Sequence, residues 1–333
     1  MYKFLQNRVV LIFLVFILFM KPSHSQEINV CLWKGYNPVV ALSNLANKFK
    51  GEFIISKHAG QSLVINQVDL EEYIEGVLSK EMDSLWPLEA LKAQAVLSRT
   101  FALHKMCENK SKNLPYDIEN SIFHQVYGVT NCEKIKEAVY STKGEVLTVN
   151  GEIAQIFFHA NCGGATALPE EVWGGKCPSL KSVNDPYCAR TPYYHWQKTF
   201  TKREISYFIG FPNLESVVIS ERGKSGRAKN LKFYATNGRV MVLSAHKFRM
   251  AVNNKAPKIL FTSPSVIPGT NFSIRMSGNN VVFTGTGYGH GVGMCQWGAR
   301  KMAEEGKDYI EILKYYFQNF SLANYKQIDS LKK

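Results

Sequence analysis

The chain lacks internal repeats, low-complexity linkers and, beyond residue 25, any apolar run long enough to cross a membrane. These absences exclude a repeat solenoid and a protein with several membrane spans. Acidic residues are also scarce: 27 Asp and Glu stand against 40 Lys and Arg among 333 residues, a formal net charge of +13. This excess of basic residues favours an anionic partner, but it is dispersed and fits simple solubility equally well.

The first 25 residues predict a secretory signal peptide. Lys3 and Arg8 precede an apolar run over residues 9–20, and the small residues at 23–25 stand at a suitable distance for cleavage. The alternative is an uncleaved N-terminal anchor. Either way we expect export to the periplasm or cell envelope. The mature chain, with a net charge of +10, would then meet a cell-wall polymer or a membrane surface rather than nucleic acid.

Seven cysteines without a CxxC pair argue against a metal site that can be seen in the sequence. In an oxidising compartment disulfides are the default, and an odd count leaves at least one free thiol. We expect one bridge in the segment with Cys107 and Cys132, and one in the segment with Cys162, Cys177 and Cys188.

The expected fold class is α+β, because short strands and helices mix without regular βαβ alternation. After the signal peptide (1–25) we expect one compact body over 26–325 around a substrate cleft. It comprises N-terminal strands (26–67), a helical hairpin with a cysteine-containing region (68–190), and a strand-rich part with a glycine-rich loop and a C-terminal helix (191–325). Within it, the patterns predict helices over 69–82, 87–106, 134–142, 202–209 and 296–317 and a strand over 153–160.

The most unusual stretch is the loop VFTGTGYGHGVGMCQWGA, residues 282–299, which places six glycines around His290. Glycines at alternate positions weaken a strand or a helix, so they indicate positive φ angles or close approach of the backbone to another group. A ligand site centred on His290 is one interpretation. A tight structural turn with His290 as a hydrogen-bonding spacer is the other.

A second candidate group lies on the helical hairpin. Glu81 ends the first predicted helix where the chain turns, and Lys92 and Arg99 are seven residues apart on one face of the second. A carboxyl group facing two cations would suit an acid and an anion-binding wall. Charged residues at such spacings are more often surface ion pairs.

Three blocks of sequence, in order, resemble the SpoIID/LytB family of stage II sporulation protein D and the amidase enhancer. They are EGVLSKEM…WPLEALKAQAVLSRTFAL, FHANCGGAT…VWGG…SVNDPYC and GTGYGHGVGMCQWGARKMAEEG…ILKYYF, and the likeness runs from about residue 28 to 320. The resemblance implies a lytic transglycosylase. Such an enzyme cleaves β-1,4 MurNAc–GlcNAc bonds in peptidoglycan strands denuded of stem peptides and leaves 1,6-anhydroMurNAc ends.

The resemblance also implies the roles of individual residues. Glu81 falls at the family's catalytic glutamate, and one carboxyl group can serve as both acid and base when the substrate's own C6 hydroxyl attacks. Lys92 and Arg99 would hold the lactyl carboxylate of muramic acid. The remaining substrate-binding residues implied by the motifs are His159, His290 and Gln296.

The chain departs from the family pattern at several positions. Asp83 replaces a proline after Glu-Met, and its charge would either raise the pKa of Glu81 or face solvent. Cys295 stands where serine is usual, which suggests a small buried thiol. Some members bind zinc near a Gln-Val-Tyr segment, but the matching residues 123–127 have no cysteine between Asp117 and His124. We therefore expect no metal or cofactor, with zinc left as the alternative.

Two other functions remain open. The first is a non-catalytic glycan-binding enhancer of a separate N-acetylmuramoyl-L-alanine amidase, as the family's second name suggests. The second is a cysteine hydrolase that pairs Cys295 or Cys162 with His290 or His159. Sugar stacking is expected from aromatic side chains, namely Trp86, Trp173, Tyr288 and Trp297.

Overall fold

The computed structural model describes residues 26–121, 123–175, 177–255, 266–328 and 331, so the predicted signal peptide lies outside the described residues. The α+β class is confirmed, with helices and short strands mixed along the chain. Within the described ranges, no helix combines the length and apolar character needed to span a membrane.

The N-terminal sheet has the strand order β2-β3-β1-β4 and carries the helices of the hairpin on one face. Its members are β1 (Glu27–Gly35), β2 (Glu52–His58), β3 (Gln61–Asp69) and β4 (Ile118–Glu119). The strands β1 to β3 occupy the segment for which N-terminal strands were predicted, residues 26–67. The helix α1 (Pro38–Leu45), which was not predicted, connects β1 to β2.

Local sequence explains the helical hairpin. The helix α2 (Leu70–Glu81) begins where the Asp69 side chain accepts hydrogen bonds from two first-turn amides, Glu71 N and Glu72 N. It ends because Met82 is extended (φ −134°, ψ 148°). The helix α3 (Leu88–Ser111) starts after Pro87 and is buried along most of its length.

Around this hairpin, the remaining elements complete one hydrophobic core. The predicted C-terminal helix is two helices, α8 and α9, separated near Gly306 (φ 87°). Of the strand predicted over 153–160, Ile153 belongs to β6 and pairs with β5, and Phe158 and His159 pair in parallel with β14. These elements are α4 (Glu133–Ser141), β5 (Glu145–Val149), β6 (Glu152–Ile153), β7 (Phe158–His159), α5 (Pro169–Val172), η1 (Pro186–Cys188), β14 (Met294–Cys295), α8 (Gln296–Glu304), α9 (Tyr309–Tyr316), β15 (Ser321–Asn324) and η2 (Tyr325–Gln327).

Residues 195–255 and 266–286 form a second lobe with its own core, whose buried residues lie between 200 and 283. Two three-stranded sheets, β12-β13-β8 and β11-β10-β9, enclose phenylalanine side chains between them and two helices. The elements are β8 (His195–Thr201), α6 (Lys202–Ile209), β9 (Leu214–Arg222), β10 (Ala228–Ala235), β11 (Val240–Ser244), α7 (Ala245–Lys255), β12 (Asn271–Ser277) and β13 (Asn280–Thr286). Helix α6 matches its predicted range.

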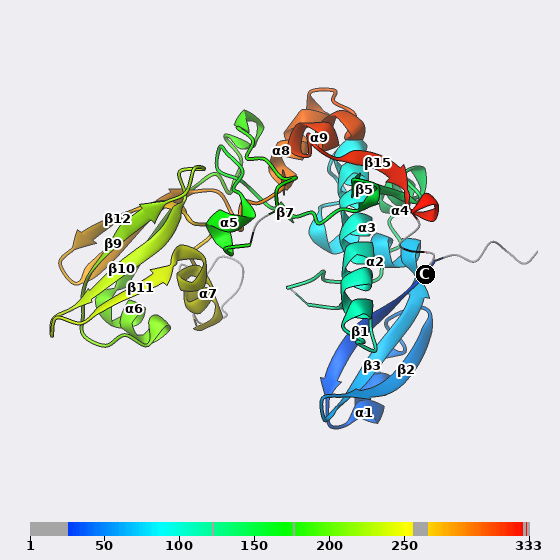
Figure 1. Ribbon diagram of the computed structural model, residues 1–333, viewed down its shortest axis with the longest axis horizontal. Coiled ribbons are helices and arrows are strands. Elements are labelled where there is room, and N and C mark those ends of the chain that lie inside the picture. Colours follow the sequence, from blue (N-terminus) through cyan, green and yellow to red (C-terminus); the bar gives the residue numbers. More distant parts are fainter. Residues whose placement is uncertain (1–25, 122, 176, 256–265, 329–330, 332–333) are drawn as a thin grey trace, which may run out of the picture.

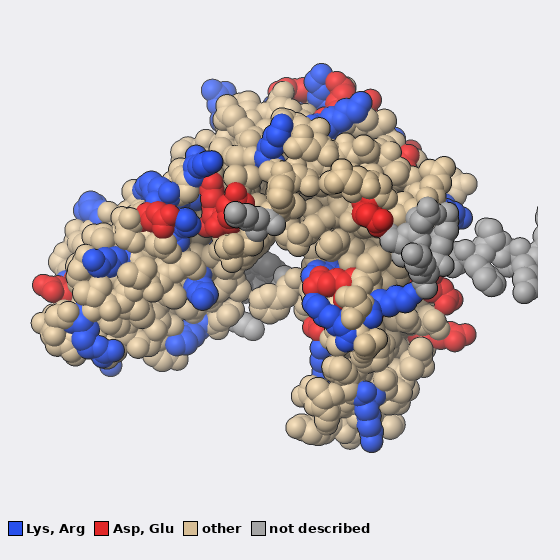
Figure 2. Space-filling model, viewed as in Figure 1, with Lys and Arg blue, Asp and Glu red and all other residues tan. Residues whose placement is uncertain are grey.

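The two lobes stand apart and are joined through the segments around α5, β7 and α8 (Figure 1). The space-filling view shows a notch between them that opens to solvent on the viewed face (Figure 2). The described residues thus form two large cores and one small cluster (Cys31, Leu63, Ile65 and Tyr116), where the sequence suggested one compact body. The domain boundaries given above and a substrate cleft at Glu81 stay predictions.

Candidate functional site

Glu81 is the last residue of α2, and the turn that follows leads directly into α3. Its side chain is partly buried, and this burial raises the pKa of the carboxyl group above its ordinary value, while a hydrogen bond with the Gln296 side chain opposes the rise. Asp83 is exposed and accepts a hydrogen bond from Leu85 N at 2.9 Å. Of the two alternatives for Asp83, the structure therefore favours the solvent-facing one.

Gln296 links Glu81 to the glycine-rich motif. It is the first residue of α8, its side chain is buried, and Nε2 donates to Oε1 of Gln94 on α3 at 3.4 Å. The amide thus lies between the end of α2 and the second turn of α3. This position brings two predicted site residues, Glu81 and Gln296, together across more than 200 residues of sequence.

Aromatic side chains continue outward from Gln296 in what we call the aromatic ridge: Trp86, Trp297, Tyr193 and Tyr288. Successive ring centroids are 4.9, 6.1 and 5.3 Å apart. The two tyrosines are 48% and 37% exposed, so the ridge offers apolar faces to solvent. The Arg300 guanidinium lies over both indoles, at 5.3 Å from Trp86 and 4.8 Å from Trp297. Sequence reasoning missed Tyr193 and Arg300, although Arg300 stands in the third family block.

A histidine cluster of His159, His246 and His290 forms next to Trp173. The rings of His159 and His290 are 5.5 Å apart, and Trp173 lies 5.0 Å from His290. Burial and neighbouring cations lower the pKa of His290 to about 3 and that of His246 to about 4. These imidazoles are therefore neutral near pH 7 and can act as hydrogen-bonding groups but not as cations.

The glycine loop packs against the protein itself. A Cβ on Gly293 would collide with the carbonyl oxygen of Phe157, and one on Gly291 with the Arg227 guanidinium, and both glycines have positive φ (74° and 85°). Nδ1 of His290 accepts a hydrogen bond from Val292 N at 3.1 Å, and Nδ1 of His159 lies 3.0 Å from Val292 O. The glycines thus allow the loop to pack closely against residues 157–163. This packing favours the structural interpretation of the glycine spacing.

Arg99 requires a correction. Its side chain is fully buried, forms a 2.6 Å ion pair with Glu71, and donates to the carbonyl oxygens of Glu145 and Val139. A guanidinium enclosed in this way cannot reach a substrate carboxylate. Arg99 is a structural residue that ties α2 and α3 to β5, and we withdraw the substrate contact predicted for it.

Lys92 lies on the side of α3 that faces α9. It pairs with Glu89 at 2.7 Å and lies 5.9 Å from the Tyr309 ring. In the part of the chain that the structure describes, no contact joins it to Glu81. A substrate-binding role for Lys92 stays a prediction.

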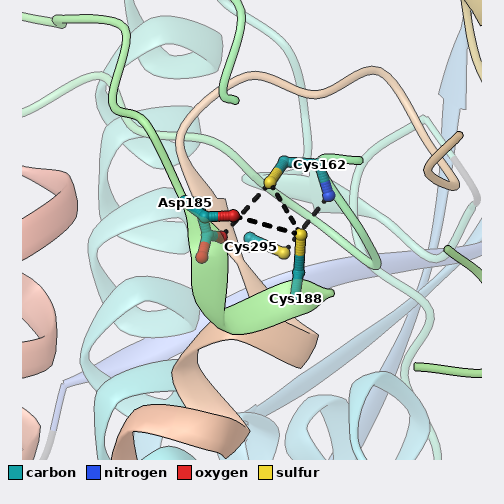
Figure 3. A group of neighbouring side chains, drawn as sticks. All are labelled: Cys162, Asp185, Cys188 and Cys295. Atoms are coloured by element: carbon teal, nitrogen blue, oxygen red, sulfur yellow. Dashed lines mark hydrogen bonds between the residues drawn. The ribbon is translucent and has the colours of Figure 1, made fainter. Parts of the chain in front are cut away.

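The expected disulfides are also corrected, because all seven cysteines are free thiols. Cys162, Cys188 and Cys295 instead gather with Asp185 into one buried group of potential metal ligands (Figure 3). The contacts of Cys162 and Cys295 run to one another, to Cys188, to Asp185 and to backbone atoms, while His159 and His290 bond to Val292. This arrangement does not supply the cysteine–histidine pair of a hydrolase.

Known proteins match most of the chain. The family described as "Stage II sporulation protein" (SpoIID) matches residues 58–149, and a domain of unknown function, DUF8618, matches residues 180–293. An uncharacterized protein of Brachyspira hyodysenteriae is 34% identical over 85% of this chain and 74% of its own length.

Two named relatives come from Bacillus subtilis. Stage II sporulation protein D is 30% identical over 81% of this chain and 78% of its own length. The amidase enhancer is 27% identical over 76% of this chain, but the match spans only 40% of its own length. The first of these matches, together with the family match, identifies the chain as a member of the SpoIID family.

Proposed function

We propose that the protein is an exported lytic transglycosylase that cleaves β-1,4 MurNAc–GlcNAc bonds in peptidoglycan strands denuded of stem peptides. The observation that carries this proposal is Glu81, a partly buried carboxyl group with a raised pKa, joined to Gln296 beside the aromatic ridge. A single acid whose burial favours the protonated form is what cleavage without a second carboxylate requires.

The proposed reaction uses Glu81 twice. The protonated carboxyl group first donates to the glycosidic oxygen as the bond from C1 of MurNAc to that oxygen breaks. The C6 hydroxyl of the same sugar then attacks C1, and the Glu81 carboxylate accepts its proton. One C–O bond breaks and one forms, water is not consumed, and the carboxyl group returns to its starting state.

The neighbouring groups would bind and orient the glycan. Gln296 would hold the Glu81 carboxyl group in position, and the ridge would stack on sugar rings. The neutral imidazoles of His159 and His290 would donate or accept hydrogen bonds. With Arg99 enclosed, we assign the muramic carboxylate to Arg300, the cation over the ridge.

The experiment compares wild type with Glu81→Gln on purified glycan strands before and after amidase treatment, with mass spectrometry of the ends. We expect anhydro ends from wild type on denuded strands only, and a loss of about 10²–10⁴-fold or more in Glu81→Gln. Glu75→Gln is the matched control, since Glu75 is a partly buried carboxyl group on the same helix whose pKa burial also raises. Hydrated reducing ends from wild type, or equal loss in both variants, would contradict the proposal.

A second candidate is a glycan-binding enhancer of an N-acetylmuramoyl-L-alanine amidase. The relative named amidase enhancer favours it, as does the exposed ridge, which needs no catalytic acid to bind strands. In that case wild type and Glu81→Gln would bind denuded strands equally, neither would cleave them, and both would raise the activity of an added amidase.

A further inference from the structure

Four potential metal ligands meet in the interior, outside the groups assigned to glycan chemistry, and one of them, Cys295, directly precedes Gln296 in the chain. Sγ of Cys162, Cys188 and Cys295 and a carboxylate oxygen of Asp185 lie within 4.8 Å of one another, and all four residues are buried (Figure 3). We infer that they form a structural site for a thiophilic divalent metal ion, with Zn²⁺ as the ion that fits best. This inference does not depend on the proposed activity.

The spacing of the ligand atoms suits a tetrahedral ion. Sγ of Cys162 lies 3.2 Å from Sγ of Cys188 and 3.2 Å from Oδ2 of Asp185. Zinc bonds of about 2.3 Å to sulfur place neighbouring sulfurs about 3.8 Å apart, so the atoms need to separate only slightly to admit the ion. Three thiolates with one carboxylate are ligands that zinc accepts, whereas hard cations prefer oxygen alone.

Backbone amides point at one of the sulfurs. Sγ of Cys295 accepts from Cys162 N at 3.2 Å and from Gly298 N at 3.4 Å. Amide donors stabilise thiolates rather than neutral thiols, and they hold metal-bound cysteines in place.

Hydrogen bonds also orient the carboxylate of Asp185. Tyr316 donates its hydroxyl proton to Oδ2 of Asp185 at 2.9 Å, and Tyr187 N donates to Oδ1 at 3.0 Å. Neighbouring donors therefore hold two of the four ligands, Cys295 and Asp185, in place.

A buried cation beside the group supports an anionic centre. Arg227, between β9 and β10, is fully buried, and its Nη2 donates to the carbonyl oxygen of Cys162. Its Nε and Nη1 have no hydrogen-bond partner among the described residues, and it belongs to none of their ion pairs. Burying an unpaired guanidinium is costly, and a zinc bound to three thiolates and a carboxylate carries two net negative charges that offset it.

Metal binding would displace the three thiol protons into solvent, so that Cys162, Cys188 and Cys295 bind as thiolates and Asp185 as a carboxylate. The ion would then fasten together three segments: the turn after β7, the η1 segment and the start of α8. Because Gln296 follows Cys295 directly, the site would also hold the amide that contacts Glu81.

The test uses the full chain, purified under reducing conditions without a metal-binding tag. We expect one zinc per chain by elemental analysis and native mass spectrometry. After exchange to Co²⁺, we expect the sulfur-to-cobalt charge-transfer bands and intense visible bands of a tetrahedral thiolate site. Cys188→Ser should weaken zinc binding about 10-fold or more, whereas Cys31→Ser, a buried free thiol elsewhere, should leave it unchanged.

The cobalt spectrum of wild type requires no variant to fold, so the inference stays testable if Cys188→Ser is unstable. Reduced wild type that takes up no stoichiometric zinc would overturn it, as would a cobalt complex without thiolate bands. A Cys162–Cys188 disulfide in freshly purified protein that binds no zinc after reduction would overturn it too.

Discussion

Glu81 and Glu75 share helix α2, and burial raises the pKa of both carboxyl groups. Only Glu81 meets the glycine-rich motif through Gln296. At the residue scale, the proposed catalytic acid Glu81 thus differs from Glu75 in the side chains around it and not in its pKa alone.

The raised pKa of Glu81 has a signed consequence for stability. The folded chain holds this proton more tightly than the unfolded chain, so the wild-type free energy of unfolding falls as pH rises from the ordinary carboxyl pKa through the raised one. Gln cannot ionise. We therefore expect Glu81→Gln to match wild type below that window and exceed it in stability above, measured by urea unfolding across pH. A constant difference at all pH values would count against the assignment.

The rate of catalysis should also depend on the protonation of the Glu81 carboxyl group. The rate of strand cleavage should fall as pH rises above the raised pKa of Glu81, because the donor form of the acid is lost. The measurement is the pH profile of anhydro-end formation at saturating strands. A rate that climbs steadily through neutral pH would rule out Glu81 as the proton donor.

Substitutions at Arg99 and Arg300 should affect different properties, the first the stability of the fold and the second the binding of strands. Arg99→Ala leaves Glu71 without its buried partner and should lower the free energy of unfolding by about 3–5 kcal/mol. Arg300→Ala should cost about 1 kcal/mol or less while weakening retention on denuded strands. Urea unfolding and strand pull-down measure the two effects, and the reverse pattern would restore Arg99 to the binding site.

At the scale of elements, the helices α2, α3 and α6 could be predicted from their periodicity and their starting signals, such as Pro87 before α3 and the Thr201–Glu204 capping box of α6. The C-terminal helix expected over 296–317 could not be predicted correctly, since the break at Gly306 interrupts a helical pattern that continues on both sides. The strand expected over 153–160 divides into Ile153, which pairs with β5, and Phe158–His159, whose partner β14 comes from a distant segment.

The candidate site likewise has features that could be predicted from the sequence and features that could not. Glu81 and Gln296 could be predicted because their motifs are local and resemble a family. The burial of Arg99 and the gathering of Cys162 with Cys295 could not, because both depend on packing between residues that are far apart in the sequence.

Gly298 tests the packing of α8 on its neighbours. A Cβ there would collide with the hydroxyl of Tyr316 and the carboxylate of Asp185. Gly298→Ala should therefore lower the free energy of unfolding by about 1–3 kcal/mol in urea unfolding. Gly175→Ala is the control, since a Cβ at that position meets open space. Equal stability of the two variants would show that α8 can shift without cost.

At the scale of the whole molecule, the core of residues 200–283 shares no buried residue with the core beneath the helical hairpin. Two separate cores should unfold in more than one step. Scanning calorimetry should then give a van't Hoff enthalpy smaller than the calorimetric one. Equal enthalpies would mean that the segments joining the lobes couple them into a single cooperative unit.

The aromatic ridge also provides an intrinsic spectroscopic probe of glycan binding. Trp86 and Trp297, two of five tryptophans, lie 4.9 Å apart at a tilt of 55° beneath a shared guanidinium. Indoles so close couple their transitions and give a paired signal in near-ultraviolet circular dichroism, and a sugar ring that binds the exposed Tyr193 next to Trp297 should change this signal. Engagement of unlabelled glycan can thus be followed in real time, in the Glu81→Gln protein as readily as in wild type.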